Sequence, residues 1–500
     1  MCTSGSLISL VAIGLADAVL TGNPLGTYWH FQHKSYTNFS LEVDRNSFNS
    51  GVAQFGASPK YNVDRVGDLV YFIYIEAIIP GLGLPFPKAQ PVSILTNADG
   101  NNANAEPYWT KDIGHAMIEK ASVSIGGQCI DEVYSEYMYI WEEISGQPGK
   151  HLIEMTGNYE AEVSLQIASR QPRVLYIPLP FWFTQNSGNA LPIVSLQFHS
   201  VQLQVYFRPL ASLLKLSWVA MNNPLNVLGA GNAYVLGDIQ ARPKFVPALS
   251  TSVQPVGDLY SLTPSVLTAN ILVTYVYLDQ RERSQFADGQ FETLINQHQH
   301  QSATASQTVN VINGYGSSDV PVSIDLNFNH PVFEFYIVAR LQNHNVCNNA
   351  CLDAQFNEWF NFVGPKDSIT DLPIDPLTLI QLKLNNANRF PDILEARYFR
   401  LVEPWQWHTN IVNTNCIYTY SMSLQPEDVQ PAGSTNFSRI DNAKLYLSVD
   451  RRCFTGPSNP AVPPSSVNPS ANSVVDLLVF VQNWNILRFK YGLGGLRFAA

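Results

Sequence analysis

Charged residues are scarce in this chain of 500 residues. Asp, Glu, Lys and Arg make up 14% of it, whereas globular proteins contain about 25%. Because charged side chains rarely stay buried, the deficit indicates that much of the chain lies inside the fold or against partners. Basic residues are fewer than acidic ones: the chain has 29 Lys plus Arg and 40 Asp plus Glu, which gives a formal net charge of −11. Proteins that bind phosphate backbones need clustered Lys and Arg, so no direct nucleic-acid binding is expected.

Cysteine is also sparse, with six residues at irregular positions. This pattern excludes a secreted disulfide scaffold and favours assembly in a reducing intracellular compartment. Cys347 and Cys351 have the spacing of a half-site for zinc, but no second Cys or His pair lies near them in the sequence. Because structural zinc takes four ligands, no zinc site is predicted there.

Long apolar runs are missing. Residues 7–20 are apolar but shorter than the roughly 20 residues that cross a bilayer, and no basic stretch precedes them as in a signal peptide. Residues 69–86 are interrupted by Glu76 and Pro80 and are predicted to form a strand followed by a loop. The sequence therefore predicts no transmembrane segment.

Familiar catalytic motifs are absent: there is no phosphate-binding P-loop, nucleophile elbow or His-Glu-x-x-His helix. His298 and His300 form a His-x-His pair, which can bind a metal in some jelly-roll enzymes. Residues 301–307 offer no carboxylate to complete such a site. The two histidines are therefore interpreted as solvated or hydrogen-bonded residues of a Gln-rich turn.

Two acidic pairs, Asp131-Glu132 and Glu142-Glu143, are the main candidates for acid–base chemistry. Neighbouring residues on a strand point to opposite faces, whereas such chemistry needs two carboxylates that converge on one bond. Both pairs are therefore predicted to lie on the solvated surface.

Trp405 and Trp407 would share one face of a strand and could stack on a sugar, although packing in a core or interface is the preferred interpretation. Asn38 and Asn436 each begin an Asn-Phe-Ser glycosylation sequon. With no secretory signal in the sequence, both are interpreted as structural residues.

Alternating apolar and polar residues dominate the chain and predict strands. Clear examples are residues 201–207, 271–279 and 445–449, and Gly126-Gly127 predicts a turn after one such strand. Helical periodicity is confined to two short candidates, residues 134–144 and 291–297. With 30 Gly and 32 Pro as turn formers, the pattern favours an all-β protein.

A locally charged stretch at residues 280–290 divides the chain into two β-rich parts of similar length, and we interpret it as a connector. Each part suits one β-sandwich, which suggests a duplicated jelly roll. Long loops are expected at residues 213–247, 343–376 and 455–472, where Pro, Gly and Asn are frequent.

Several short stretches spread over the chain are distinctive: Leu20-Thr-Gly-Asn-Pro24, Tyr36-Thr-Asn-Phe39, Ser124-Ile-Gly-Gly-Gln128 with Ile130-Asp131, Tyr176-Ile-Pro-Leu-Pro-Phe-Trp-Phe183, Tyr275-Val-Tyr-Leu-Asp279, Phe328-Asn-His-Pro331, Gln425-Pro-Glu-Asp-Val-Gln-Pro431 with Asn436-Phe-Ser-Arg-Ile-Asp-Asn-Ala443, and Asn485-Ile-Leu-Arg488 with Gly492-Leu-Gly-Gly-Leu496. In this order they resemble segments of the major capsid proteins of nucleocytoplasmic large DNA viruses, such as phycodnaviruses and iridoviruses. Residues 213–261 and 343–382 depart from the family pattern.

The resemblance implies an all-β fold of two consecutive eight-stranded antiparallel jelly rolls with long loops and a few short helices. The implied parts are an N-terminal segment (1–23) on the inner capsid face, a first jelly roll (24–280), a connector (281–290) and a second jelly roll (291–500). It further implies a structural protein and no enzyme, with no catalytic, cofactor-binding or metal-binding residues.

The same resemblance implies pseudo-hexagonal homotrimers that tile the icosahedral shell of a virion assembled inside the host cell. Expected partners are neighbouring capsomers, minor capsid proteins and an internal membrane, the last two through the N-terminal segment, although residues 1–20 could equally pack on their own domain. Two alternatives stay open: an all-β carbohydrate enzyme or lectin, and a minor capsid or penton component.

Overall fold

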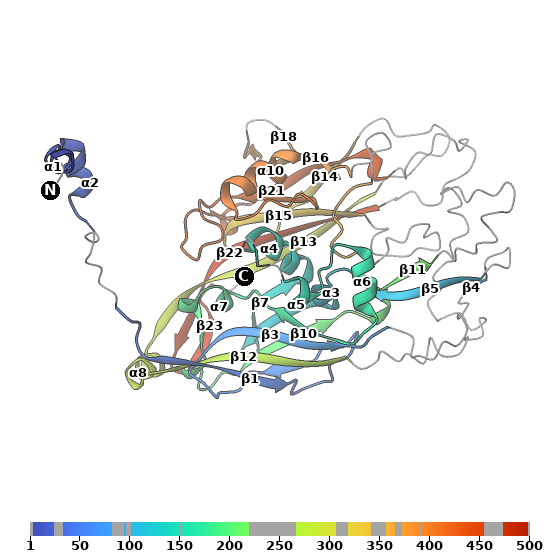
Figure 1. Ribbon diagram of the computed structural model, residues 1–500, viewed down its shortest axis with the longest axis horizontal. Coiled ribbons are helices and arrows are strands. Elements are labelled where there is room, and N and C mark those ends of the chain that lie inside the picture. The colour runs from blue at the N-terminus through green and yellow to red at the C-terminus, as the bar shows by residue number, and fades with distance from the viewer. Residues whose placement is uncertain are drawn as a thin grey trace. The chain divides into compact units, whose positions relative to one another are not determined.

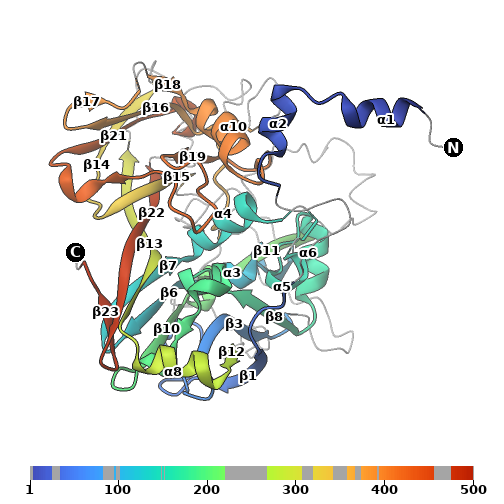
Figure 2. The same cartoon turned by 90° about the vertical axis from the view of Figure 1, so that its left-hand side faces the viewer.

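The structure is a computed structural model (Figures 1 and 2). It describes residues 4–24, 34–82, 95–96, 102–147, 149–150, 152–219, 267–306, 319–341, 357–365, 373–390, 393–454 and 474–498. The chain divides into two compact units, Met1–Ser40 and Leu41–Ala500. The first unit contains the helices α1 (Ser4–Val11) and α2 (Leu15–Thr21), and the second contains the β-sandwiches.

Two sheets form the first sandwich. One has the order β1 (Phe39–Ser47), β12 (Thr268–Leu278), β3 (Leu69–Ile79) and β8 (Arg173–Pro178), with β9 (Leu191–Pro192) beside β3. The other has the order β2 (Lys60–Asn62), β10 (Val201–Phe207), β6 (Ile118–Ile125) and β7 (Gln128–Tyr134). A further sheet joins β11 (Leu214–Val219), β5 (Asn102–Trp109) and β4 (Leu95–Thr96).

The second sandwich, coloured yellow to red in Figure 1, also has two sheets. One has the order β13 (Phe291–Ser306), β22 (Val474–Lys490), β15 (Pro331–Leu341) and β19 (Ile417–Ser421), with β20 (Thr435–Asn436) beside β15 and β23 (Leu493–Leu496) beside β22. The other has the order β14 (Val320–Asp325), β21 (Ala443–Val449), β16 (Leu377–Leu384) and β17 (Ala387–Asn388), with β18 (Leu394–Glu395) beside β16.

Both sandwiches have the same strand order. When the eight principal strands of each, among the described residues, are numbered along the chain, one sheet runs 1-8-3-6 and the other 2-7-4-5. This order is that of a jelly roll, in which the chain alternates between two packed antiparallel sheets. The predicted all-β fold of two consecutive jelly rolls is therefore confirmed, and the duplication that the two similar lengths suggested is visible in the topology.

The sheet that contains β15 and β22 lies between two hydrophobic cores. On β15, Tyr336 and Val338 pack into the core of the first sandwich, whereas their neighbour Ile337 packs into the core of the second. On β22, Phe480 packs into the core of the first sandwich and Val479 into the core of the second. Because both faces of these strands are covered, their sequences are almost continuously apolar instead of alternating.

Outer strands show the alternation that the sequence predicts. In β10, Val201, Leu203, Val205 and Phe207 are buried and the residues between them are half-buried. The predicted strands at 271–279 and 445–449 are likewise confirmed as β12 and β21. One sheet face on a core and the other toward solvent accounts for this pattern.

Short helices cover the first sandwich and its junction with the second (Figure 2). They include α3 (Ile113–Met117), α4 (Ser135–Ser145), α5 (Ile153–Thr156) and α6 (Glu162–Ser169), and α10 (Ala396–Trp407) belongs to the second sandwich. The helix predicted at 134–144 is confirmed as α4. None of the helices in the described part of the chain has the length and hydropathy to cross a membrane.

Some local predictions are wrong. Residues 291–297 begin strand β13, whose 16 residues pair with β22 from Phe291 to Ser306, so tertiary pairing overrides the helical pattern. The connector expected at 280–290 is not one of these errors and stays a prediction: most of it forms helix α8 (Gln280–Asp288), whose first backbone N–H is capped by the Asp279 carboxylate at 2.8 Å. The loop expected at 213–247 begins as strand β11, and its remainder, like most of 343–376 and all of 455–472, lies outside the described residues.

Candidate functional site

A buried carboxylate joins the two jelly rolls. Glu136, in the first turn of α4, is 6% exposed, and its Oε1 accepts hydrogen bonds from Arg208 Nη2 at 3.0 Å and Arg340 Nη1 at 2.9 Å. Arg208 directly follows β10 of the first jelly roll, and Arg340 lies in β15 of the second. The Trp359 indole contacts both guanidinium groups, with its centroid 3.8 Å from Arg208 Cζ and 5.3 Å from Arg340 Cζ. Burial raises the pKa of Glu136, but the two arginines outweigh it and lower that pKa to about 2.

A second polar contact joins β7 to β13. The Nδ1 atom of His298 lies 3.0 Å from Asp131 Oδ2, and the His298 backbone N–H donates to Asp131 Oδ1 at 2.9 Å. Next to this pair, the Gln297 side chain donates to the Ile130 carbonyl. These bonds fasten the edge strands of the two jelly rolls to each other.

The structure corrects the interpretation of residues 131 and 298. The sequence predicts a solvated Asp131, but this residue is only 3% exposed because β13 covers it. Its neighbour Glu132 points to the other face of the strand, where its carboxylate lies 3.1 Å from Lys120 Nζ. His298 lies in a long strand and not in a turn. The predicted opposite orientation of the two carboxylates is thus correct, but the predicted exposure of Asp131 is wrong.

His300 is the other member of the His-x-His pair. Its ring lies 4.7 Å from the ring centroids of both Tyr134 and Phe480, and burial lowers its pKa. A hollow of about 550 Å³ beside it is lined by residues of β7 and β13, including Asp131 and His298. Among the described residues, Asp131, His298 and His300 do not bring three ligand atoms within 4.8 Å of one another, as a shared metal ion would require.

The third polar contact is around His408, the residue after α10. His408 Nε2 lies 3.1 Å from Oε1 of Glu334 in β15, and its Nδ1 lies 3.1 Å from Oε1 of Glu427. Burial alone would lower the pKa of His408, but the charge of Glu334 and its hydrogen bonds to Glu334 and Glu427 raise it to about 9. The protonated imidazole therefore ties α10 to β15 and to the segment that contains Glu427.

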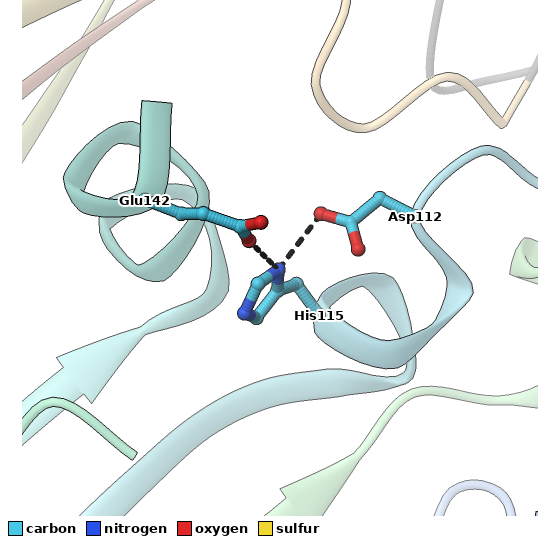
Figure 3. Close-up of side chains that lie close together, drawn as sticks. All are labelled: Asp112, His115 and Glu142. Carbon is cyan, nitrogen blue, oxygen red and sulfur yellow. Dashed lines mark hydrogen bonds and ion pairs between the residues drawn. The ribbon is translucent and has the colours of Figure 1, made fainter. Parts of the chain in front are cut away.

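A fourth cluster lies within the first jelly roll (Figure 3). His115 Nδ1 is 2.7 Å from Asp112 Oδ2 and 3.6 Å from Glu142 Oε2. Burial alone would lower the pKa of His115, but the charge of Asp112 and its hydrogen bond, with the charge of Glu142, raise it overall. Burial raises the pKa of Glu142 to about 7 against the opposing charge of His115. Among the described residues, this is the one group of three potential metal ligands within 4.8 Å of one another.

The remaining candidates from the sequence do not converge with these clusters. Trp405 and Trp407 lie in the helix α10 and not on a strand, and Trp405 is 72% exposed. Asn436 accepts a hydrogen bond from the Ser438 backbone N–H at 3.0 Å. Cys347 and Cys351 lie outside the described residues.

The clusters around Glu136 and Asp131 thus connect polar side chains of the two jelly rolls, and together they fix one relative orientation. The sequence patterns do not single out Glu136, Arg208, Arg340 or His408. Arg208 and Arg340 lie 72 and 204 residues away from Glu136 along the chain. A local spacing pattern in the sequence therefore cannot predict these contacts. The signal that could have found them is a charged residue that interrupts a strongly apolar strand, as Arg340 does in β15.

The comparisons with known proteins agree over nearly the whole chain. Residues 27–279 match a family described as "Major capsid protein N-terminus", and residues 282–495 match one described as "Large eukaryotic DNA virus major capsid protein". The major capsid protein of Pyramimonas orientalis virus is 28% identical over 522 residues, which cover 99% of both chains. That of Paramecium bursaria Chlorella virus 1 is 28% identical over 519 residues, which cover 99% of this chain and all of the relative.

Solved structures show the same fold. A chain of the PBCV-1 virus capsid superimposes with a TM-score of 0.66 at 22% identity, covering 95% of this chain and all of the other. The Faustovirus major capsid protein gives a TM-score of 0.61 at 12% identity, covering 97% and 96% of the two chains.

Proposed function

The chain belongs to the family of major capsid proteins of large eukaryotic DNA viruses and is a structural protein of the virion shell, and from this premise we propose that it builds the shell as a homotrimeric capsomer. The observation that carries the proposal is the repeated strand order of the two jelly rolls. Three chains with two similar sandwiches each give six sandwiches around one axis. Such a trimer can occupy a nearly hexagonal position in an icosahedral lattice next to identical neighbours.

The energetics of association support a permanent trimer. A chain with 46% hydrophobic and only 14% charged residues has apolar surface to bury in a partner. Obligate interfaces bury about 2,000–5,000 Å². At about 25 cal/mol per Å² this corresponds to tens of kcal/mol if most of the area is apolar, whereas association costs about 4–15 kcal/mol.

The polar junction supports a mechanical role for the two jelly rolls as one rigid body. The contacts centred on Glu136 and Asp131 hold the sandwiches in one orientation, and a lattice contact on either sandwich then positions both. The His408 cluster stiffens the second sandwich itself. We propose no catalytic role for the chain, because within the described ranges the charged residues of these three clusters are paired with one another across packed elements.

We propose the following parts: an N-terminal segment at 1–23, a first jelly roll at 24–280, a connector at 281–290 and a second jelly roll at 291–500. Strand β12 ends at Leu278 and β13 begins at Phe291, which supports the position of the connector. The N-terminal segment contains α1 and α2, which are rich in Leu, Ile, Val and Ala. This composition supports a contact with a minor capsid protein or an internal membrane on the inner face of the shell.

Size-exclusion chromatography with light scattering of the purified full chain tests the trimer. We expect a stable species of three times 55.6 kDa that persists on dilution. A monomer would contradict the proposal, and a monomer that also binds oligosaccharides would favour the alternative of a carbohydrate-binding protein.

A further inference from the structure

Three short helices of the first jelly roll pack closely around one buried group of polar side chains. Asp112 precedes α3, His115 lies within α3, and Glu142 lies in α4. Helix α5 closes the cluster on another side: a Cβ atom added to Gly114 would lie 2.9 Å from the Thr156 Cα. The side chains are therefore held by packed backbone and not by a surface loop.

The three side chains converge on one point. Figure 3 shows the carboxylates of Asp112 and Glu142 on either side of the His115 ring, both directed at its Nδ1 atom, at 2.7 Å and 3.6 Å. The exposed fractions of the side chains are 0% for Asp112, 2% for His115 and 16% for Glu142. Solvent therefore contributes little to the stability of these charges.

Hydrogen bonds leave this cluster incompletely satisfied. Nδ1 of His115 can carry a single proton, and its short contact is with Asp112. Oδ1 of Asp112 and Oε2 of Glu142 are buried without a hydrogen-bond partner. Buried acceptors without a partner are rare in native proteins, and a bound cation satisfies carboxylate oxygens of this kind directly.

The net charge of the cluster also favours a bound cation. Two carboxylates face one imidazole, and Glu143 adds a third negative charge that acts on both His115 and Glu142. When the acids are ionised, the buried group carries a net negative charge even with a protonated imidazole. A divalent cation would neutralise it, and in a low-dielectric interior such compensation is strongly favourable.

We propose that Asp112, His115 and Glu142 bind a divalent transition-metal ion of the zinc class, which cross-links α3 to α4. Zinc takes histidine nitrogen and carboxylate oxygen at about 2.0–2.2 Å, which places neighbouring ligand atoms of a tetrahedral site roughly 3.3–3.5 Å apart. The contacts of 2.7 and 3.6 Å from His115 Nδ1 bracket this separation. The side chains need only small movements to enclose an ion.

The donor set selects the class of metal. Calcium and magnesium prefer oxygen ligands alone, whereas an imidazole nitrogen with carboxylates suits zinc and its neighbours in the first transition row. Three protein ligands leave a fourth position for water. Because the ligands come from α3 and α4 and are buried, we infer that the ion would fix α4, the helix whose first turn carries Glu136 to the junction.

Metal binding by the full chain after treatment with a chelator tests this proposal. Titration with Zn²⁺, followed by calorimetry and by elemental analysis after gel filtration, should give one tightly bound ion per chain and a rise in unfolding temperature. X-ray absorption of the zinc-loaded protein should show nitrogen and oxygen neighbours at about 2.0 Å with the signature of a single imidazole.

Matched variants separate this site from adventitious binding at the other histidines. Glu142→Gln and Asp112→Asn keep side-chain size and should weaken Zn²⁺ binding at least about 100-fold. Glu143→Gln, one position away, removes a nearby charge but no ligand and should weaken binding less than about 10-fold. The trimer mass and the far-UV circular dichroism spectrum of each variant show that it is folded. Absence of a tight equivalent in the unaltered chain, or equal affinity of Glu142→Gln and Glu143→Gln, would overturn the proposal.

Discussion

Arg340 of the second jelly roll donates a hydrogen bond of 2.9 Å to Glu136 of the first. The same Glu136 oxygen also accepts from Arg208 of the first jelly roll at 3.0 Å. One carboxylate oxygen thus accepts hydrogen bonds from two buried guanidinium groups that approach from different domains. Most of the free energy of such a cluster depends on keeping every charge paired.

The first prediction concerns the substitution Glu136→Gln. It removes the negative charge but leaves Arg208 and Arg340 buried close together. Breaking a buried ion pair in this way costs about 3–5 kcal/mol, which corresponds to a fall in unfolding temperature of roughly 6–20 °C for a domain of this size. Differential scanning calorimetry measures this fall in unfolding temperature.

The matched control is Glu132→Gln, four residues earlier. Glu132 pairs with Lys120, and both side chains are about one-third exposed. Solvent-exposed pairs contribute about 0–1 kcal/mol, so this variant should unfold within about 2–4 °C of the unaltered chain. Equal shifts in the two variants would contradict the importance of the Glu136 cluster.

A second prediction concerns pH. The folded-state pKa of His408 is raised to about 9, whereas an unperturbed histidine titrates near 6.5. Protonation of His408 therefore stabilises the folded chain fully below about pH 6.5, and this stabilisation is lost as the pH rises to about 9. The difference between the two pKa values corresponds to a stabilisation of about 3 kcal/mol.

Urea unfolding at pH 6, 7.5 and 9 measures this loss. Glu403 lies nearby and burial raises its pKa to about 7, so it also changes stability over part of this range. The comparison with His408→Gln isolates the histidine: the gap in stability between the two proteins should narrow from pH 6 to pH 9. A constant gap would show that His408 does not titrate as the geometry requires.

The turn between β6 and β7 gives a third prediction. Gly126 and Gly127 have φ values of +58° and +85°, which other residues seldom adopt. A Cβ on Gly126 would also lie 2.5 Å from His199 Nδ1, an atom hydrogen bonded to the backbone of Gly494, whereas a Cβ on Gly127 meets nothing within 4 Å. Gly126→Ala should cost about 2–5 kcal/mol and Gly127→Ala about 1–2 kcal/mol in chemical unfolding. The reverse order would be inconsistent with the close approach of His199.

Removal of residues 1–20 tests the proposed role of the N-terminal segment. The truncated chain should form trimers with an unchanged unfolding temperature, because the strands of both jelly rolls begin after this segment. In cells that produce the other virion proteins, it should fail to enter complete shells, as seen by electron microscopy. Normal incorporation of the truncated chain would remove the contact with an inner partner from the account.

The general architecture can be predicted because its signals are local. Alternation in residues 201–207 follows directly from one buried sheet face, and helix α4 has its own short periodicity. The error at 291–297 arises because β13 is decided by its long pairing with β22 and not by its own sequence. The error at Trp405 and Trp407 arises because Pro404 argues against a helix, although the buried residues Ala396, Phe399 and Glu403 have helical spacing.

The functional clusters are harder to predict because their members are far apart in the chain. Asp112 and His115 have the spacing of neighbours on a helix, but Glu142 reaches them from a separate helix. The exposure of Asp131 is mispredicted because nothing in its own strand shows that β13 will cover it. Tertiary contacts of this kind are set by the packing of whole sandwiches, which local sequence patterns do not encode.

Electron cryo-microscopy of the purified full chain can test both the trimer and the fixed orientation of the two jelly rolls, because it shows the subunits and both sandwiches of each in one measurement. We predict a threefold particle with a nearly hexagonal outline, six β-sandwiches and continuous density between the Glu136 and Arg340 side chains within each subunit. A solitary subunit, or a particle in which the two sandwiches of one chain adopt variable orientations, would contradict the account.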